Sequence, residues 1–301
     1  LGMSAHRDAM PVLRMQPDIQ NQGYAAGTAA AMAVKGGTTV RDIDIKALQH
    51  HLVDMKILTQ GDLSMKDNFP LSNDEIDTAV AELADNYKGL PIIMTDRARA
   101  LPRIQGAFQS AEGESKTIYA HVLALLGKPD GEAQLLAKFK STPWDKGWNY
   151  RGMGQFNRSV SWVDSYAIAL GHCKSKAAVP ALIEKAAQLT ERSEYSHFRA
   201  IARALEEIGD KSAIPVLADI LKRPGIGGRW QTMGANPPVV PGYQNAAGDW
   251  ERTLSLRELC IARALYRLGD TPDKLGQRTL EAYAADPRRT YAKHAKLVLG
   301  K

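Results

Sequence analysis

Residues 196–223 read SHFRAIARALEEIGDKSAIPVLADILKR and predict two short amphipathic helices that fold back on each other. The apolar residues of the first helix recur at i, i+4 and i+7, on one face: Ile201, Leu205 and Ile208. Gly209 is expected to end this helix, and Pro215 falls in the first turn of the second, where its missing N–H is harmless. Such a hairpin cannot bury its apolar face alone, so it needs neighbours.

The hairpin has relatives elsewhere in the chain. Residues 261–270, IARALYRLGD, nearly repeat residues 201–210, IARALEEIGD, and looser copies end at Gly127, Gly171 and Gly300. Repeated helical hairpins predict an all-α fold, an α-solenoid in which each hairpin packs on the next. The repeats resemble HEAT-like repeats over roughly residues 96–301. This resemblance implies an architecture but no function, because such repeats serve scaffolds, inhibitors and enzymes alike.

The N-terminal stretch has a different composition. From Gln22 the sequence QGYAAGTAAAMAV predicts a helix of small residues, which Gly36 and Gly37 close. Small side chains on every face indicate that something approaches the backbone closely. That neighbour is either another element of the fold or a ligand at the helix N-terminus, where free N–H groups and the positive dipole end favour anionic groups.

Three motifs in this stretch are similar to a known family. Ser4-x-His6, Arg14-Met15 and the QGxAAG phrase with its Ala-rich helix resemble the C-terminal flavin-contacting segment of FAD-dependent oxidoreductases of the two-domain, Rossmann-type class. In that family the helix points its N-terminus at the flavin, whose reduced form carries negative charge. The phrase DIDIKALQ at 42–49 also resembles the family. The resemblance implies flavin contacts by Gln22, Gly23, Ala25, Ala26 and Gly27, with Arg14 and His6 nearby.

One motif of a complete flavoenzyme is missing. The sequence contains no strand followed by Gly-x-Gly-x-x-Gly, the phrase that holds the pyrophosphate of FAD. We therefore expect the nucleotide-binding portion to lie upstream of Leu1, in a longer protein of which this chain is the C-terminal part. On its own the chain is expected to bind no FAD and to be inactive. The alternative is that the Ala/Gly helix simply packs tightly inside a domain of its own.

The expected domain organisation has three parts. Residues 1–57 form the end of a flavin-binding domain, residues 58–95 connect, and residues 96–301 form the solenoid. In the connecting region Ser72 or Asn73 should cap a helix that runs to about Leu83. A second helix is expected from Asp96 to Ser110, with a late start or a kink at its proline.

Two Gly/Pro/Asn-rich interruptions of the solenoid, at 141–159 and 224–250, are longer than ordinary helix connections and should lie on the same side. They carry aromatic and cationic residues that suit a protein or glycan partner. The candidate partner surface consists of Trp144, Trp148, Tyr150, Arg151, Trp230, Tyr243 and Trp250. The alternative is that the tryptophans only pack the loops onto the ends of helices.

Composition and charge narrow the range of possible functions. Residues 1–115 carry 11 Lys+Arg and 15 Asp+Glu, whereas residues 116–301 carry 28 and 18. A basic solenoid could bind nucleic acid, but its charges stand beside acids, as at Arg257-Glu258, which favours a solvated surface. No apolar run reaches the ~20 residues of a membrane span, and no signal peptide is visible.

Active-site and metal-binding patterns are lacking in the sequence. Cys173 and Cys260 make neither a disulfide framework nor a zinc site, and the adjacent His50 and His51 cannot chelate from one helix. Trp162-x-Asp164 is only a weak resemblance to HEAT-like DNA glycosylases. We therefore predict no metal and name no catalytic residue. Three functions stay open: a flavoenzyme module, a protein- or glycan-binding scaffold, and, least favoured, a nucleic-acid-binding solenoid.

Overall fold

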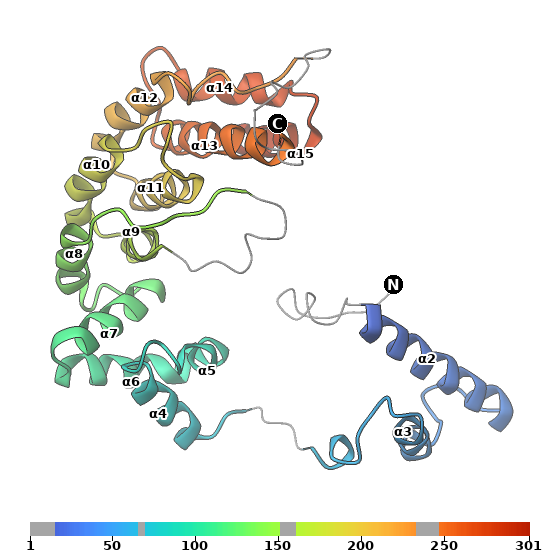
Figure 1. Cartoon of the computed structure of the whole chain (residues 1–301). Coiled ribbons are helices and arrows are strands. Elements are labelled where there is room, and N and C mark those ends of the chain that lie inside the picture. Colours follow the sequence, from blue (N-terminus) through green and yellow to red (C-terminus); the bar gives the residue numbers. More distant parts are fainter. Residues whose placement is uncertain (1–15, 66–69, 151–160, 233–246) are drawn as a thin grey trace. The chain divides into compact units, whose positions relative to one another are not determined.

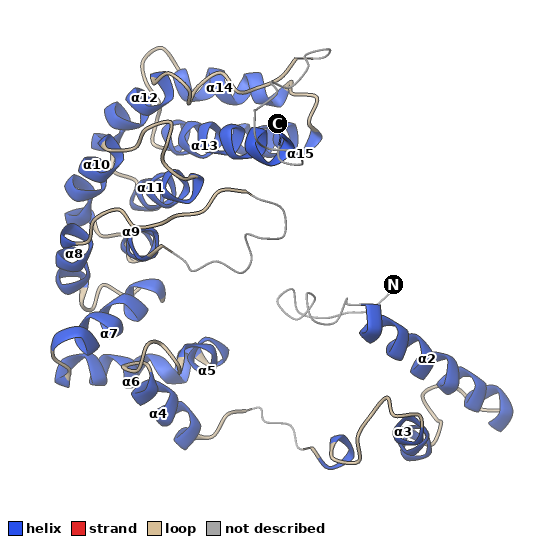
Figure 2. Ribbon diagram, viewed as in Figure 1, coloured by secondary structure: helices blue, strands red, loops and turns tan. Residues whose placement is uncertain are grey.

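A computed structural model describes residues 16–65, 70–150, 161–232 and 247–301, with the side chains of 247–250 left out. Helices and no strands occur in these ranges (Figure 2), which confirms the all-α prediction. None of the helices in the described part combines the length and apolar character needed to cross a membrane. The α-helices are α2 Gln16–Gly36, α3 Ile45–Asp54, α4 Asn73–Glu82, α5 Leu90–Thr95, α6 Arg97–Ser110, α7 Gly113–Leu125, α8 Glu132–Ser141, α9 Trp162–His172, α10 Val179–Ala187, α11 Tyr195–Ile208, α12 Ile214–Lys222, α13 Ala247–Arg267, α14 Leu275–Ala284 and α15 Arg289–Leu299.

The chain divides into two compact units, Leu1–Pro70 and Leu71–Lys301. In the first unit, α2 packs against α3 through a small apolar cluster centred on Ala29, Leu48 and Leu52. Asp44 caps the start of α3 by accepting hydrogen bonds from two backbone N–H groups. The unit therefore presents two described helices joined by a modest core.

The second unit is a stack of helical hairpins (Figure 1). Helices α7, α9, α11 and α13 follow one another in one layer, and α8, α10, α12 and α14 follow in the other. Each hairpin contacts its sequence neighbours, and one continuous apolar core runs from α7 to α15. This is the arrangement that the repeated sequence motifs predict.

The hairpin at 196–223 forms as its sequence predicts. Helix α11 ends at Ile208, and Gly209 follows in the left-handed conformation with φ +77°. Pro215 is the second residue of α12, where no helical partner for its nitrogen exists. The inward residues Ile201 and Leu217 are fully buried, so the predicted apolar faces do meet.

Gly171 has a different role from the one its motif predicts. It lies inside α9 and does not end the helix, which continues to His172. A Cβ atom placed on Gly171 would lie 2.6 Å from the Cα of Ala204 on α11. The glycine is therefore needed for the close approach of two buried helices, a requirement that local sequence does not reveal.

Helices α4, α5 and α6 precede the stacked hairpins. One prediction about them is confirmed and another is corrected. Ser72 caps α4, and its hydroxyl and Glu75 form a reciprocal capping box. Pro102 does not delay the start of the second helix, because α6 begins at Arg97 and Pro102 lies inside it. The alternative of a kink at Pro102 stays a prediction. The short helix α5 follows Gly89, a segment where the sequence predicts only a break.

The second unit has two long connections between helices. One runs from the end of α8 to the start of α9, and the other from the end of α12 to the start of α13. Trp250 lies within α13 and not in a loop, because that helix begins at Ala247. Three of the predicted loop tryptophans remain: Trp144, Trp148 and Trp230.

Candidate functional site

The connection after α8 is held on the second unit by backbone hydrogen bonds. The Trp148 N–H donates to the Ser196 hydroxyl at 3.0 Å, and the Ser196 N–H donates to the Trp148 carbonyl at 3.1 Å. The backbone N–H of Tyr195 donates to the side chain of Asn149 at 2.7 Å. The N–H of Tyr150 donates to Thr253 on α13 at 3.1 Å. The described part of this connection, residues 142–150, is thus fixed to the fold by hydrogen bonds.

Three aromatic residues of this connection pack against the fold to different degrees. Trp144 lies 4.4 Å from the ring of His197, centroid to centroid, beneath the segment. Trp148 and Tyr150 form a cluster with Tyr195, with centroid separations of 5.3 to 5.4 Å. Trp144 therefore supports the packing interpretation, whereas Tyr150 also carries the guanidinium of Arg252 on its ring at 4.0 Å.

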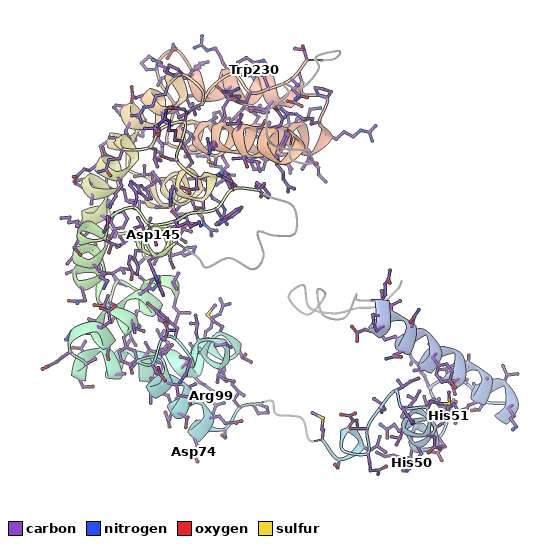
Figure 3. All side chains as sticks on the ribbon, in the orientation of Figure 1. His50, His51, Asp74, Arg99, Asp145 and Trp230 are labelled. Atoms are coloured by element: carbon purple, nitrogen blue, oxygen red, sulfur yellow. The ribbon has the colours of Figure 1, made fainter. Side chains whose placement is uncertain are left out.

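The connection after α12 is fixed by buried carboxylates. Glu258 accepts hydrogen bonds from the backbone N–H groups of Gly228 and Arg229, both at 2.7 Å, and from the Tyr283 hydroxyl at 2.8 Å. Burial raises the pKa of Glu258, although these three donors oppose that shift. Trp230 follows and remains 40 % exposed against the edge of Tyr283 (Figure 3).

Both connections pack against the first half of α13. The first reaches it at Thr253, and the second reaches it at Ser255 and Glu258. The prediction that they lie on the same side of the solenoid therefore holds for their described parts. Arg151 and Tyr243 of the predicted surface lie outside the described residues, and the Trp250 side chain is not described.

A buried histidine–carboxylate pair lies under the first connection. His197 Nδ1 is 2.7 Å from Asp164 Oδ1 and its Nε2 is 3.3 Å from Glu194 Oε2, with His197 and Asp164 only 3 % and 5 % exposed. Burial lowers the pKa of His197, but the hydrogen bond and charge of Asp164, with the charges of Glu194 and Asp145, outweigh burial and raise it. Both side chains are almost fully buried, and His197 lies against Trp144 and Gly147 of the connection.

Sequence reasoning missed this pair for a clear reason. His197 and Asp164 are 33 residues apart on different helices, and each looks like an isolated packing residue. The only signal was Asp164 at the start of a repeat helix, where its backbone N–H donates to the hydroxyl of the N-cap residue Ser161 at 3.0 Å. Asp145, visible in Figure 3, completes this network by accepting the backbone N–H of Trp162 at 2.6 Å.

A second buried histidine joins α7 to its neighbours. His121 bonds the Tyr87 hydroxyl through Nδ1 at 2.8 Å and the Ser165 hydroxyl through Nε2 at 2.9 Å. Burial lowers the pKa of His121 to about 4, because no carboxylate compensates its charge. Ser165 lies in α9 and Tyr87 in the turn between α4 and α5, so the two bonds join α7 to both segments.

Arg257 corrects an expectation about surface charge. It is buried and does not pair with Glu258; it donates instead to the carbonyl of Glu191 at 2.9 Å. Other arginines do pair with acids as expected, for example Arg203 with Glu207 at 2.8 Å.

Among the described residues, no group of three or more His, Cys, Asp or Glu side chains could hold a metal ion.

In the first unit, helix α2 has one packed and one open face. Ala29 and Ala33 are buried, whereas Gly23, Ala26 and Gly27 are exposed. A Cβ atom placed on Gly23 or Gly27 would meet nothing within 4 Å. The open face is thus a smooth strip on which another group can approach the backbone.

The packed face of α2 is anchored to α3. The Tyr24 hydroxyl lies 3.0 Å from Nε2 of His51, and the two rings stack 5.9 Å apart, so His51 connects α3 to α2. Figure 3 labels His51. Ala25 packs against the apolar cluster and Gln22 is half-buried. The predicted flavin contacts are therefore divided between the two faces.

The start of α2 corrects the sequence prediction. The helix does not open at Gln22, because it already includes Gln16. Pro17 is tolerated near a helix start and Asp18 is favourable there, and these residues allow the earlier beginning. The N–H groups of residues 22–27 are therefore used inside the helix. His6 and Arg14 lie outside the described residues.

Comparison with protein families decides what this segment resembles. Residues 2–52 match the FAD dependent oxidoreductase family. Residues 199–223 match the PBS lyase HEAT-like repeat, which is the hairpin of α11 and α12. Comparisons with curated proteins and with solved structures returned no match.

The two family matches fall on different units. The FAD dependent oxidoreductase match includes all of α2 and most of α3, and so contains the open face around Gly23 and Gly27. The HEAT-like match lies within the second unit. The chain thus joins a segment of a flavoenzyme family to a helical-repeat unit.

Proposed function

We propose that this chain is a module of an FAD-dependent oxidoreductase, in which the first unit contributes a flavin-contacting helix and the second a HEAT-like repeat unit. The observation that carries this proposal is the family match over residues 2–52. It spans all the residues to which the sequence motifs assign flavin contact. No reaction or substrate is assigned.

The surface of α2 suits a flat ring. Gly23, Ala26 and Gly27 leave the backbone open along one side, and α3 holds the other side in place. A bound flavin would supply the redox chemistry, and this chain's residues would orient one face of its ring and exclude water there. These residues would contact the ring by van der Waals packing and not by backbone hydrogen bonds, because their N–H groups are bonded within the helix.

The described part of α2 already begins at Gln16, so the positive end of the helix dipole is not at Gln22. We assign the electrostatic part of flavin contact to that end. Arg14 and His6 precede it in the sequence and keep their proposed place near the cofactor. Gln22 lies at the boundary between the open and packed faces of α2, and Ala25 lies on the packed face. Both residues would therefore support the helix and contribute little direct contact to the ring.

The adenine dinucleotide needs a further binding portion. The sequence lacks Gly-x-Gly-x-x-Gly, and two helices with a small core cannot enclose FAD. We propose that a flavin-binding domain completes the site, and that this chain alone holds no FAD.

A pair of bulky substitutions in the natural protein tests the role of α2. Gly27→Trp places a large ring on the open face, and Lys35→Trp places the same ring on an exposed position near the other end of the helix. Gly27→Trp should lower the flavin content of the purified protein at least tenfold, and Lys35→Trp should leave it unchanged. Equal flavin content in both variants would contradict the proposal.

The second unit offers a second candidate function, as a binding module. Trp230 favours it, because this side chain stays exposed on a segment that buried carboxylates hold in place. An exposed aromatic on a rigid support is typical of a binding hot spot. Trp230→Ala should then weaken capture of a protein or glycan partner without lowering the melting temperature, whereas a loss of stability alone would indicate a packing role.

A further inference from the structure

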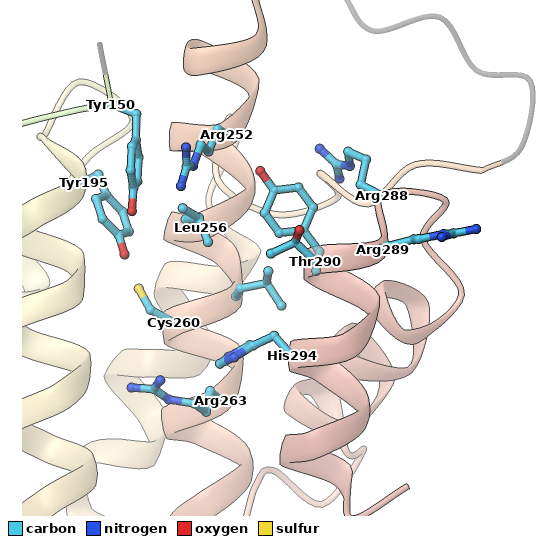
Figure 4. Close-up of a pocket in the computed structure, with 12 residues that line it drawn as sticks. Tyr150, Tyr195, Arg252, Leu256, Cys260, Arg263, Arg288, Arg289, Thr290 and His294 are labelled. Carbon is cyan, nitrogen blue, oxygen red and sulfur yellow. The ribbon is translucent and has the colours of Figure 1, made fainter. Parts of the chain in front are cut away.

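A cavity of about 560 Å³ opens in the second unit between α11, α13 and α15 (Figure 4). Its volume is in the range of sites that bind small molecules. Helix α11 contributes Tyr195, α13 contributes Arg252 and Cys260, and α15 contributes Tyr291 and His294. The cavity therefore exists only where these three helices pack together.

Among the described residues, one lining arginine both points into the cavity and lacks a carboxylate partner. The guanidinium of Arg288 is fully used by carboxylates, a hydroxyl and a carbonyl. Arg263 is paired with a glutamate of α11 at 2.8 Å, and Arg289 stands at the rim and points away (Figure 4). Arg252 projects into the cavity from α13, and its only contact in the described part of the chain is with an aromatic ring. One guanidinium is therefore available to a ligand.

A tyrosine hydroxyl faces the cavity without a partner. Tyr195 is only 7 % exposed, and its hydroxyl points into the cavity beside Cys260 (Figure 4). The backbone and ring of Tyr195 are held by Asn149, Trp148 and Tyr150, but its hydroxyl makes no hydrogen bond within the described residues. Burial raises the pKa of Tyr195, so this hydroxyl stays protonated and can donate. A polar group on a buried side chain normally has a partner, which a ligand would supply here.

His294 adds a second polar group at the same end of the cavity (Figure 4). Burial, together with the charges of Arg263 and Arg267, lowers the pKa of His294, so the imidazole is neutral at pH 7. A neutral imidazole offers one N–H donor and one acceptor nitrogen. Neither nitrogen is hydrogen-bonded within the described ranges, so this end of the cavity can both donate to a ligand and accept from it.

Flat apolar faces lie between the cation and this polar end. Tyr150 and Tyr195 lie together, with ring centroids 5.4 Å apart. Leu256 lines the cavity from α13 and Tyr291 from α15. The guanidinium of Arg252 lies 4.0 Å from the centroid of the Tyr150 ring. Aromatic and aliphatic walls beside a guanidinium suit a planar aromatic ring that bears an anionic group.

We propose that this cavity binds a planar aromatic monocarboxylate with a hydroxyl group at its other end, the carboxylate at Arg252 and the hydroxyl at Tyr195 and His294. A carboxylate accepts paired hydrogen bonds from a guanidinium group, and its single charge matches the single available arginine. Cys260, beside Tyr195, follows Arg252 by about 12 Å along α13, so a ring with a short side chain spans the two ends. The proposal rests on the second unit alone and is independent of any flavin contact by α2.

Isothermal titration of the whole chain at fixed salt and neutral pH tests the proposal. The probe is 4-hydroxycinnamate; cinnamate lacks its hydroxyl, 4-hydroxycinnamyl alcohol lacks its charge, and acetate lacks its ring. 4-Hydroxycinnamate should bind roughly tenfold more tightly than the alcohol and acetate, and about threefold more tightly than cinnamate. Absence of 4-hydroxycinnamate binding, or equal binding of either ring analogue, would overturn the proposal.

Substitutions locate the two ends of the ligand. Arg252→Gln should weaken binding of 4-hydroxycinnamate roughly tenfold and leave that of the alcohol unchanged, because only the charged contact is lost. Tyr195→Phe keeps the packed ring, so it should reduce the affinity for 4-hydroxycinnamate to about that for cinnamate and leave cinnamate binding unchanged. Arg289→Gln is the matched control, because this arginine points away from the cavity, and it should have no effect.

Two results would refute the assignment. One is unchanged 4-hydroxycinnamate binding by Arg252→Gln or by Tyr195→Phe. The other is an equal loss of cinnamate and 4-hydroxycinnamate binding in Tyr195→Phe, which would show that the hydroxyl supports the fold and does not contact the ligand.

Discussion

Replacing Gly171 by alanine tests the close contact between α9 and α11. The added Cβ would lie 2.6 Å from the Cα of Ala204 and 3.4 Å from its carbonyl oxygen. These are backbone atoms, so no rotation of a side chain can relieve the clash. The helices must instead move apart by about 1 Å to restore ordinary contact distances of 3.5–4.0 Å.

Two opposing effects set the magnitude. Alanine is favoured over glycine within a helix by about 1 kcal/mol. Overpacking a buried contact costs about 1–3 kcal/mol, and a 1 Å gap also weakens dispersion contacts of the surrounding core. Leu170 and Ile201, at this interface, are fully buried, so the repacking cost should prevail. We expect Gly171→Ala to destabilise the second unit by about 1–2 kcal/mol.

Gly106→Ala is the matched control. Gly106 lies in α6, and a Cβ there meets nothing within 4 Å, so only the helix-propensity gain of about 1 kcal/mol remains. Thermal unfolding followed by far-UV circular dichroism should show a melting temperature about 2–8 °C lower for Gly171→Ala and about 2–4 °C higher for Gly106→Ala. A rise in both variants would refute the reasoning.

Three further predictions concern the second unit. His121, with its pKa lowered to about 4, protonates in the unfolded chain before the folded one, so stability should fall by about 2–4 kcal/mol as pH drops from 7 to 4; urea midpoints of His121→Gln should fall less over the same range. Glu258→Ala leaves two backbone N–H groups unpaired and should cost about 3 kcal/mol or more, with a change in Trp230 fluorescence, whereas a wild-type midpoint would exclude the anchoring role. Ser72→Ala removes the capping box of α4 and should cost about 1 kcal/mol in the same unfolding assay; no loss would show that the cap adds no stability.

The sequence predicts the repeat architecture well because each hairpin has local signals. The i, i+4, i+7 pattern at Ile201, the glycine at 209 and the proline at 215 each determine a helix face or end without help from distant residues. The same holds for Ser72 at the start of α4. Such features follow from backbone geometry and capping, which the chain carries locally.

Features that depend on distant residues could not be predicted. Three contacts connect segments that are far apart in sequence. They are the pairing of His197 with Asp164, the bond of the buried Arg257 to the Glu191 carbonyl, and the tight contact of Gly171 with Ala204. A single sequence gives no register between repeats, so these juxtapositions appear only in the structure.

The candidate flavin contact was accessible from the sequence only as a resemblance. The QGxAAG phrase indicates the family, and the match over residues 2–52 agrees with it. The phrase does not determine where the helix begins, because Pro17 and Asp18 permit an earlier start. Consequently the roles of Gln22 to Gly27 stay predictions, with Gly23, Ala26 and Gly27 on the open face as the leading contacts.

The most direct test of the central claim is the visible absorbance of the polypeptide that the source cell produces, purified and weighed by intact-mass spectrometry, beside this chain expressed alone. We predict a yellow protein, longer than this chain, with the absorbance bands of oxidised flavin, and a colourless isolated chain. A colourless natural protein of this chain's length would contradict the account.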